Sequence, residues 1–356
     1  MLPRHLPVLD GLRAIAVLLV LWSHVPNRTP GYPEWLEIAR VFLEPGGLGV
    51  EIFFVLSGFL ITRILISEQR NQRPVRFFLM RRVLRIFPIY YLLLAIMLVV
   101  DPRPEIGWCA VYLSNVITIA DPARDFPLQH TWSLCIEEHF YLLWPLVVAF
   151  SPPSRPPRLL AFVVLPGALI AALLVGWYGD LATASRTVQH ASPIRFFSLG
   201  VGCLLAYVEP RIHALPRRFT ALAALLLVPA VACNNVVLYA LLPHWLMAPP
   251  PVPPQAGPAL WLVSACCLAT SALLCCLTLG HRRWSPFRLL TARPLRAIGR
   301  ISYGLYLYHL PIFHALLRPA PSGSRVLIAV TLTLAAATTS YWVVERPILR
   351  YGSKLR

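Results

Sequence analysis

An arginine and a histidine share the first apolar segment of the chain, LPVLDGLRAIAVLLVLWSHV. Arg13 and His24 are eleven positions apart, and eleven helical steps return to nearly the same face, about 16 Å further along the axis. Histidine titrates near neutral pH, so His24 is a candidate general base for a hydroxyl group. Asp10 lies one turn before Arg13 and is placed to pair with it. Alternatively, His24 is an interfacial residue that follows Trp22 in an aromatic belt.

Two arginines begin another apolar segment, LMRRVLRIFPIYY (79–91). Arg82 and Arg85 are at i, i+3 spacing, so they share a helix face, and paired guanidinium groups suit phosphate oxygens. Such phosphates belong to coenzyme A or to lipid head groups. The same spacing recurs among Arg70, Arg73 and Arg76, so anchoring on the cytoplasmic side of a membrane is the simpler alternative.

Two adjacent carboxylates interrupt a third apolar segment, HTWSLCIEEHFYLLWPL (130–146). Glu137 and Glu138 point in different directions on a helix, so at least one should face a polar interior. There it would neutralise Arg13, orient His24 or remain protonated. A purely structural ion pair is the alternative.

Polar groups at helical spacing also occur in IGRISYGLYLYHLPI (298–312), where Ser302, Tyr303, Tyr306 and His309 stand among apolar residues. His309 is either a second base or a buried histidine bonded to a backbone carbonyl. Glycines crowd GGLGVEIFFVLSGFLI (46–61), which we interpret as close helix packing. The sequence has no G-x-S-x-G, Walker A, G-x-G-x-x-G or H-E-x-x-H motif.

The composition indicates that a membrane surrounds these residues. Of 356 residues, 57% are hydrophobic and 13% are charged, against about 25% charged in soluble domains. This excludes a soluble enzyme and a disordered chain. The net charge of +17 would suit nucleic acid, but the arginines form short clusters between apolar runs, as the positive-inside rule requires. We therefore expect no nucleic-acid partner.

The apolar runs predict an all-α, polytopic transmembrane bundle that forms one membrane domain over residues 1–356. Loops rich in arginine alternate with neutral or proline-rich loops, so both termini should be cytoplasmic and the number of spans even. We expect about ten spans. They lie near 8–25, 47–66, 77–100, 131–150, 158–178, 192–208, 219–242, 258–280, 298–317 and 325–344. The apolar stretch 106–119 is too short to cross and should be re-entrant or interfacial.

The eight cysteines lie almost wholly inside apolar runs and lack the spacing of metal ligands. We interpret them as packing residues and expect no metal site. The first apolar run lacks a cleavage site, so no removable signal peptide is expected. Abundant arginine, alanine and proline point to a bacterial genome, and hence to a multi-pass protein of the bacterial plasma membrane.

Together these segments resemble the membrane-bound acyltransferase-3 family of O-acyltransferases. The resemblance runs from about residue 7 to 347. It follows six stations in order: LDGLRAIAVLLVLWSHV, GVEIFFVLSGFLI, RRVLRIFPIYY, TWSLCIEEHFYLLWP, ISYGLYLYHLPI and the closing ERP. The R-x10-H pairing of the family falls on Arg13 and His24, and its R-x-x-R falls on Arg82 and Arg85.

The resemblance implies ten spans, a cytoplasmic acyl-CoA donor and an acceptor met on the outer side. Cys135, Ile136 and His139 depart from the family's W-S-L-S-V-E-E-Q-F-Y motif, and His139 puts a titratable ring beside the glutamates. We expect no fused SGNH esterase-like domain of the kind that some members of the family have, and hence delivery of the acyl group without one.

The resulting hypothesis is transfer of an acyl group, expected to be acetyl, from acyl-CoA to a hydroxyl of a carbohydrate, glycolipid or glycosylated small molecule. His24 would act as base or transient acyl carrier, and no tightly bound cofactor is expected. The proposed catalytic residues are His24, Arg13, Glu137 and Glu138. Arg82 and Arg85 are the proposed ligands of acyl-CoA. The proposed supporting residues are Asp10, Ser57, Trp132, His139, Tyr303 and His309. A glycolipid transporter or flippase is the alternative, and a catalytically silent membrane partner is a weaker one.

Overall fold

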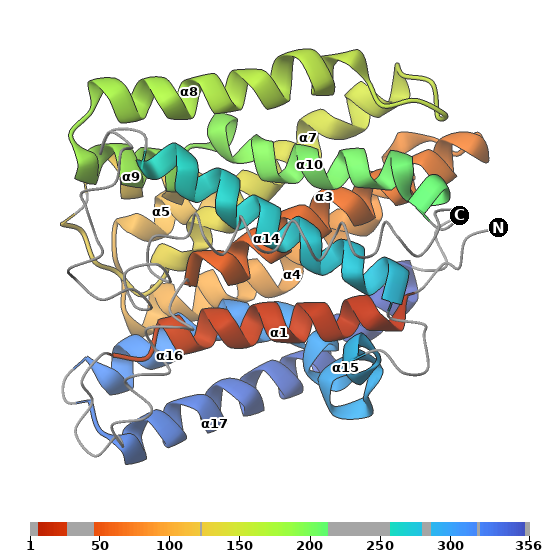
Figure 1. Ribbon diagram of the computed structural model, residues 1–356. Coiled ribbons are helices and arrows are strands. Elements are labelled where there is room, and N and C mark those ends of the chain that lie inside the picture. The colour runs from red at the N-terminus through yellow and green to blue at the C-terminus, as the bar shows by residue number, and fades with distance from the viewer. Residues whose placement is uncertain are drawn as a thin grey trace.

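The computed structural model describes residues 6–26, 46–121, 123–212, 257–279, 286–318 and 321–352, and these residues form helices without a strand. The long helices run in a common direction, with α8 and α17 on opposite outer faces (Figure 1). The long helices are α1 (Pro7–Ser23), α3 (Gly46–Arg70), α4 (Val75–Val100), α7 (Trp132–Ala149), α8 (Leu165–Tyr178), α10 (Ser192–Ile212), α14 (Gly257–Leu279), α16 (Ser302–Leu317) and α17 (Gly323–Ser340).

Shorter helical pieces connect or extend them. These are α5 (Glu105–Ala110), α6 (Ser114–Ala120), η1 (Gln129–Thr131), η2 (Leu160–Val164), α9 (Leu181–His190), η5 (Pro286–Thr291), α15 (Arg293–Arg300), η6 (Tyr341–Glu345) and α18 (Arg346–Gly352). The start of α1 and the end of α18 lie at the same end of the bundle (Figure 1).

Four of the described helices are long and apolar enough to cross a membrane, and a fifth span results if the bent pair α9–α10, with its 48° bend, counts as one. Nine of the ten predicted segments coincide with described helices; the segment near 219–242 lies outside the described residues. The number of about ten spans stays a prediction.

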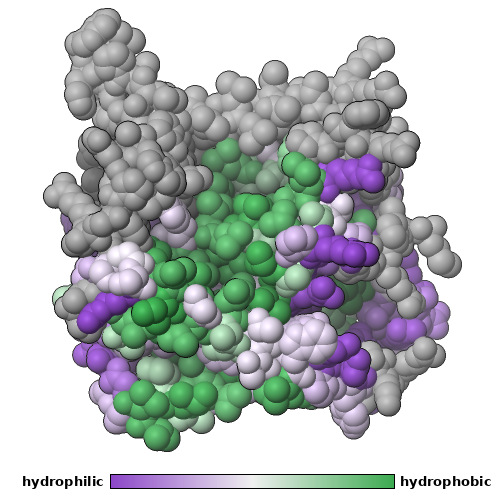
Figure 2. All heavy atoms as spheres, turned by 90° about the horizontal axis from the view of Figure 1, so that it is seen from below, coloured by the Kyte–Doolittle hydropathy of each residue, from purple (hydrophilic) through white to green (hydrophobic). Residues whose placement is uncertain are grey.

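The face along α17 is suited to lipid. Figure 2 shows this face from below: apolar side chains gather across its middle, and hydrophilic ones lie towards its sides. The exposed apolar residues of α17 and η6 include Leu327, Ile328, Leu332, Leu334, Trp342 and Val343. Lipid tails accept such side chains, whereas water would not.

The stretch 106–119, expected not to cross, folds as the two short helices α5 and α6. They are separated at Tyr112, whose φ of 56° lies in the left-handed region and ends α5. Helices of six and seven residues span about 10 Å each, too little for a bilayer core.

Glycines bring α3 and α10 into close contact. A Cβ on Gly58 would overlap the carbonyl oxygen of Leu199, and one on Gly202 would overlap that of Val55. The two backbones therefore pack without intervening side chains, as the glycine-rich segment 46–61 predicts. Six of the cysteines among the described residues are buried, which fits packing residues.

Substituting Gly58 by alanine should destabilise the bundle. The added methyl group meets backbone, which cannot rotate away, and overpacking of this kind costs about 1–3 kcal/mol. We expect a lower unfolding temperature in detergent for Gly58→Ala. Gly107 has no atom within 4 Å of a built Cβ, so Gly107→Ala is the matched control. Equal unfolding temperatures for the two variants would contradict this packing.

Ion pairs also join α3 to α10 inside the bundle. Arg195 donates to Glu51 at 2.5 Å, and the side chains are 1% and 0% exposed. The Arg195 guanidinium also lies 4.9 Å from the ring centroid of Phe54. Arg63 pairs with Glu209 at 2.9 Å. Removing one partner of such a pair would leave an uncompensated buried charge, so these pairs fix the mutual position of the two helices.

Candidate active site

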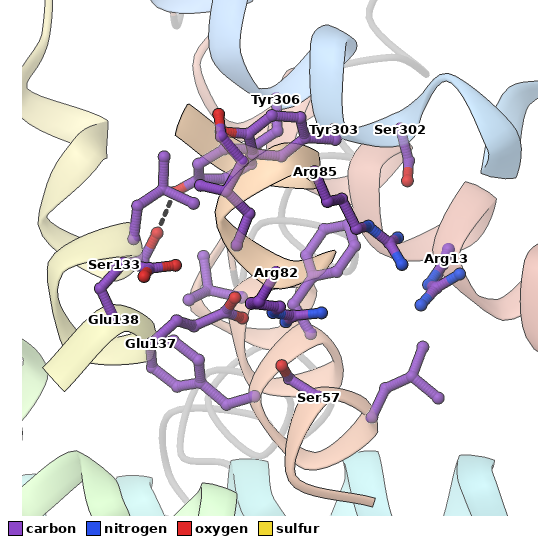
Figure 3. A pocket seen from close by; sticks show the side chains of 16 residues that line it. Arg13, Ser57, Arg82, Arg85, Ser133, Glu137, Glu138, Ser302, Tyr303 and Tyr306 are labelled. Carbon is purple, nitrogen blue, oxygen red and sulfur yellow. Dashed lines mark hydrogen bonds between the residues drawn. The ribbon is translucent and has the colours of Figure 1, made fainter. Parts of the chain in front are cut away.

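A cavity of about 100 Å³ lies among α1, α3, α4, α7 and α16. We call it the arginine cavity. Its polar lining consists of Arg13, Ser57, Arg82, Arg85, Ser133, Glu137, Glu138, Ser302, Tyr303 and Tyr306. Most of these residues come from apolar segments that are far apart in the sequence, and the fold brings them together around one space (Figure 3).

Three guanidinium groups converge on this space. Arg13 reaches it from α1, and Arg82 and Arg85 reach it from α4 (Figure 3). The predicted pair of Arg13 with Asp10 is present, at 3.9 Å. Arg82 lies over the ring of Tyr141, 4.0 Å from its centroid, an arrangement in which the ring face attracts the cation. The shared helix face predicted for Arg82 and Arg85 is thus turned into the bundle.

Both glutamates border the same cavity. Side chains one residue apart differ by about 100° around a helix, which still lets Glu137 and Glu138 reach one space from α7 (Figure 3). The prediction that at least one of them faces a polar interior is confirmed for both. Three arginines and two carboxylates line the cavity, and the guanidinium groups offer several hydrogen-bond donors to an anionic ligand.

Tyr141 connects the carboxylate to α3. Its hydroxyl donates to Glu137 Oε2 at 2.7 Å and is hydrogen-bonded to Ser57 Oγ. The tyrosine thus holds Glu137 with its oxygen and Arg82 with its ring. The contact between Glu137 and Tyr141 could be predicted from their spacing, because residues four apart on a helix are neighbours.

Removing this hydroxyl should weaken the site and the fold together. In Tyr141→Phe the ring stays under Arg82, but Glu137 loses a donor; hydrogen bonds to charged groups contribute about 1.5–3 kcal/mol. We expect a lower unfolding temperature in detergent. The control is Tyr91→Phe, which loses a bond to the Ala110 carbonyl at 2.9 Å on the exposed surface. If the control variant is destabilised as much as Tyr141→Phe, this role for Tyr141 is wrong.

His24 borders a different cavity. A second space of about 360 Å³ lies beyond the end of α1, and we call it the histidine cavity. The residues that line it include His24, Asp125, Gln129, His130, Trp132, Phe313, His314 and Arg318. The sequence predicts Arg13 and His24 on nearly the same face of one helix. The ten residues between them place the two side chains at separate cavities along α1.

Three histidine rings meet at the inner end of the histidine cavity. The ring of His309 lies 4.9 Å from that of His24 and 5.0 Å from that of His130, centroid to centroid. His309 is fully buried, and its Nδ1 lies 2.6 Å from the Tyr306 carbonyl. The carbonyl bond expected as one alternative for His309 is therefore present.

Backbone carbonyls fix which nitrogen of each ring carries a proton. His24 Nδ1 lies 2.8 Å from the Val20 carbonyl, and His130 Nε2 lies 3.1 Å from that of Leu307. Because a carbonyl only accepts, these ring nitrogens donate. In the neutral rings His24 Nε2 and His130 Nδ1 are then acceptors. Burial lowers the pKa of His130 to about 3, so its ring is uncharged at neutral pH.

A thin partition divides the two cavities. Tyr306 and Ser133 line the arginine cavity, and His130 lines the histidine cavity. The Tyr306 hydroxyl is bonded to Ser133 Oγ at 2.5 Å (dashed in Figure 3) and donates to the His130 carbonyl at 2.8 Å. The partition thus consists of the hydroxyl groups of Tyr306 and Ser133 and of His130, and all three side chains are buried.

Other predicted supporting residues separate between these spaces. Ser57 and Tyr303 line the arginine cavity, and Trp132 lines the histidine cavity. His139 lines neither; its Nδ1 lies 2.8 Å from Ser192 Oγ, so it joins α7 to α10. Among the described residues, no cluster of His, Cys, Asp or Glu side chains is arranged to hold a metal ion.

Comparison with known proteins places the chain among acyltransferases. The sequence profile described as the acyltransferase domain matches residues 6–345. The peptidoglycan O-acetyltransferase OatA of Listeria monocytogenes is 28% identical over 98% of this chain. The O-acetyltransferase OatA of Staphylococcus aureus is 29% identical over 99% of it. The chain spans 56% and 58% of the length of these relatives. No solved structure matches the chain significantly.

Proposed function

This chain belongs to the acyltransferase domain family, and from that premise we propose that it is a membrane O-acyltransferase. It moves an acyl group, expected to be acetyl, from acyl-CoA to a hydroxyl of a carbohydrate-containing acceptor. The observation that carries the proposal is the arginine cavity, where three guanidinium groups from two helices face one space. The names of the relatives, which describe O-acetylation and in one case peptidoglycan, support a sugar acceptor.

Acyl-CoA suits the arginine cavity by charge. Guanidinium groups bind phosphate oxygens through two parallel hydrogen bonds, so Arg82 and Arg85 hold the phosphates of the donor. Arg13 reaches the same cavity from α1, where it positions the pantetheine arm. Glu137 and Glu138 offset part of the positive charge of the arginines, and Glu137, through Tyr141, holds Arg82 in place. The arm then bridges the roughly 16 Å of helix between Arg13 and His24.

His24 completes the reaction at the other end of that arm. Its Nε2 accepts the proton of the acceptor hydroxyl, and the hydroxyl oxygen attacks the thioester carbonyl carbon. The carbon–sulfur bond breaks, CoA leaves as a thiolate, and the thiolate takes up the proton from His24. The locked Nδ1–H leaves Nε2 as the basic atom. A transient acyl group on Nε2 is the two-step version of the same transfer.

The topology follows the same proposal. Donor entry from the cytoplasm requires the arginine cavity to open on the side of the arginine-rich loops, with both termini there, about ten spans and a multi-pass position in the bacterial plasma membrane. The common end of α1 and α18 supports this (Figure 1). One membrane domain then carries both cavities. Its substrates are acyl-CoA and the sugar-containing acceptor, and the lipid bilayer surrounds it.

The deciding experiment follows the donor. Membrane vesicles containing the chain are given acetyl-CoA labelled in the acetyl group, together with cell-envelope glycans. Free CoA thiol and labelled glycan are then measured. We expect both to rise in step. A transporter or flippase would move glycolipid without releasing CoA, so glycolipid movement at constant acetyl-CoA would contradict the proposal and favour that alternative.

A further inference from the structure

We propose that the histidine cavity is the acceptor site and that it binds one uncharged sugar ring. This inference rests on the proposed function and adds to it the location and chemistry of the second substrate. The cavity volume of about 360 Å³ lies in the range of small-molecule sites, about 300–1,000 Å³.

Two residues that line this cavity, His24 and His130, each have a ring nitrogen that accepts hydrogen bonds. His130 is 2% exposed, and its Nδ1, the acceptor of the neutral ring, has no partner among the described residues. His24 Nε2 is also an acceptor, because Nδ1 donates to the helix. Buried acceptors are satisfied by donors, and a ligand rich in hydroxyl groups supplies several donors at once.

The remaining lining fits the other features of a sugar. Trp132 and Phe313 offer aromatic surfaces for the apolar face of a pyranose ring, and Gln129 offers an amide that both donates and accepts. Gln129 is half-buried. Its side chain has no hydrogen bond within the described part of the chain. A few placed polar groups on an apolar lining are typical of a ligand site.

Charge distinguishes the two cavities. The charged lining residues described for the histidine cavity, Asp125 and Arg318, form an ion pair with each other, so the site favours an uncharged ligand. The arginine cavity has its three arginines and favours the phosphates of the donor. A sugar bound in the histidine cavity would then place one of its hydroxyl groups next to His24.

The test maps where a sugar binds, with no need for turnover. The probe is the methyl β-glycoside of glucosamine carrying a diazirine in its N-acyl chain, photolysed with the full-length chain in lipid nanodiscs. Cross-linked peptides are then sequenced by mass spectrometry. We expect labels within 123–132 and 310–318, with no reduction by excess acetyl-CoA. Labels around Arg82 and Arg85, displacement by acetyl-CoA, or no label in the expected segments would overturn the proposal.

Variants sharpen the same readout. Gln129→Leu, which keeps volume and breaks no hydrogen bond described in the structure, should lower the cross-linking yield at least about fivefold, the loss expected for one hydrogen bond. Trp132→Ala should lower it as well. Trp177→Ala is the matched control, because Trp177 is 65% exposed on α8. Unchanged yield in Gln129→Leu and Trp132→Ala would overturn the site.

Failure of the proposed acceptor site and failure of the proposed function give different results in this experiment. Sugar labelling at the expected peptides without any CoA release would leave the acceptor site standing and defeat acyl transfer from acyl-CoA. CoA release with sugar labels elsewhere would keep the transferase and defeat this site.

Discussion

His24→Ala is expected to lower acyl transfer by about 10²–10⁴-fold, the usual contribution of a positioned general base. The substitution removes the one imidazole that α1 holds at the histidine cavity. It should leave the Michaelis constant for acetyl-CoA unchanged, because the donor phosphates bind at the arginine cavity. His24 is the half-buried cap of a helix end, so the chain should still fold. Product formation and the unfolding temperature in detergent are the measurements.

His139→Gln is the matched histidine control. His139 lines neither cavity, and glutamine retains a polar group to reach Ser192 Oγ. We expect activity close to that of the unmodified chain, within about twofold, since substitutions away from special sites are usually within ±0.5 kcal/mol. Full activity in His24→Ala would defeat the base mechanism. Equal losses in both variants would indicate a general structural effect.

The second large effect is expected at Arg82. Arg82→Ala removes a charged donor to the CoA phosphates, and such hydrogen bonds contribute about 1.5–3 kcal/mol. The Michaelis constant for acetyl-CoA should rise roughly 10- to 100-fold. Arg82→Lys should recover only part of this, because an ammonium group lacks the two-pronged geometry.

The neighbouring residue supplies the control for this measurement. Arg81 pairs with Glu68 at 3.2 Å and is not among the residues that line the arginine cavity. Glu68 has a second partner, Arg73, at 3.7 Å, so the loss of Arg81 leaves it paired. Arg81→Ala should therefore leave donor affinity nearly unchanged. Acetyl-pantetheine, which lacks the phosphates of CoA, should bind the Arg82→Ala variant as it binds the unmodified chain. A defect that persists with this donor would show that Arg82 acts on the fold and not on phosphate.

Several parts of the site could be predicted because they depend on local spacing. The i, i+3 spacing puts Arg82 and Arg85 on one face, and the cost of charge in an apolar segment marks Arg13 and the two glutamates. Apolar runs likewise predict most helix positions. These signals act within one helix, so a single sequence contains them.

The remainder depends on contacts between distant segments. His130 and Tyr306 are 176 positions apart, and nothing in either segment indicates that they share a partition. The pair of Glu51 and Arg195 is separated by 144 positions, and no spacing within either segment indicates the partner of the other. The division into two cavities has the same origin, since periodicity gives the face of α1 but not which helices end beside it.

The partition of Tyr306, Ser133 and His130 also affects the permeability of the membrane. A protein whose cavities open towards opposite sides would conduct protons and ions if those cavities joined, and the cell would lose its membrane potential. The side chains between them are neutral: two hydroxyls bonded to each other and an imidazole whose pKa is about 3. An ion crossing this layer would lose its hydration without gaining a counter-charge, at a cost of several kcal/mol or more. Under the proposed function, this thin neutral wall insulates the bilayer, and the uncharged pantetheine arm carries the acyl group past it to His24.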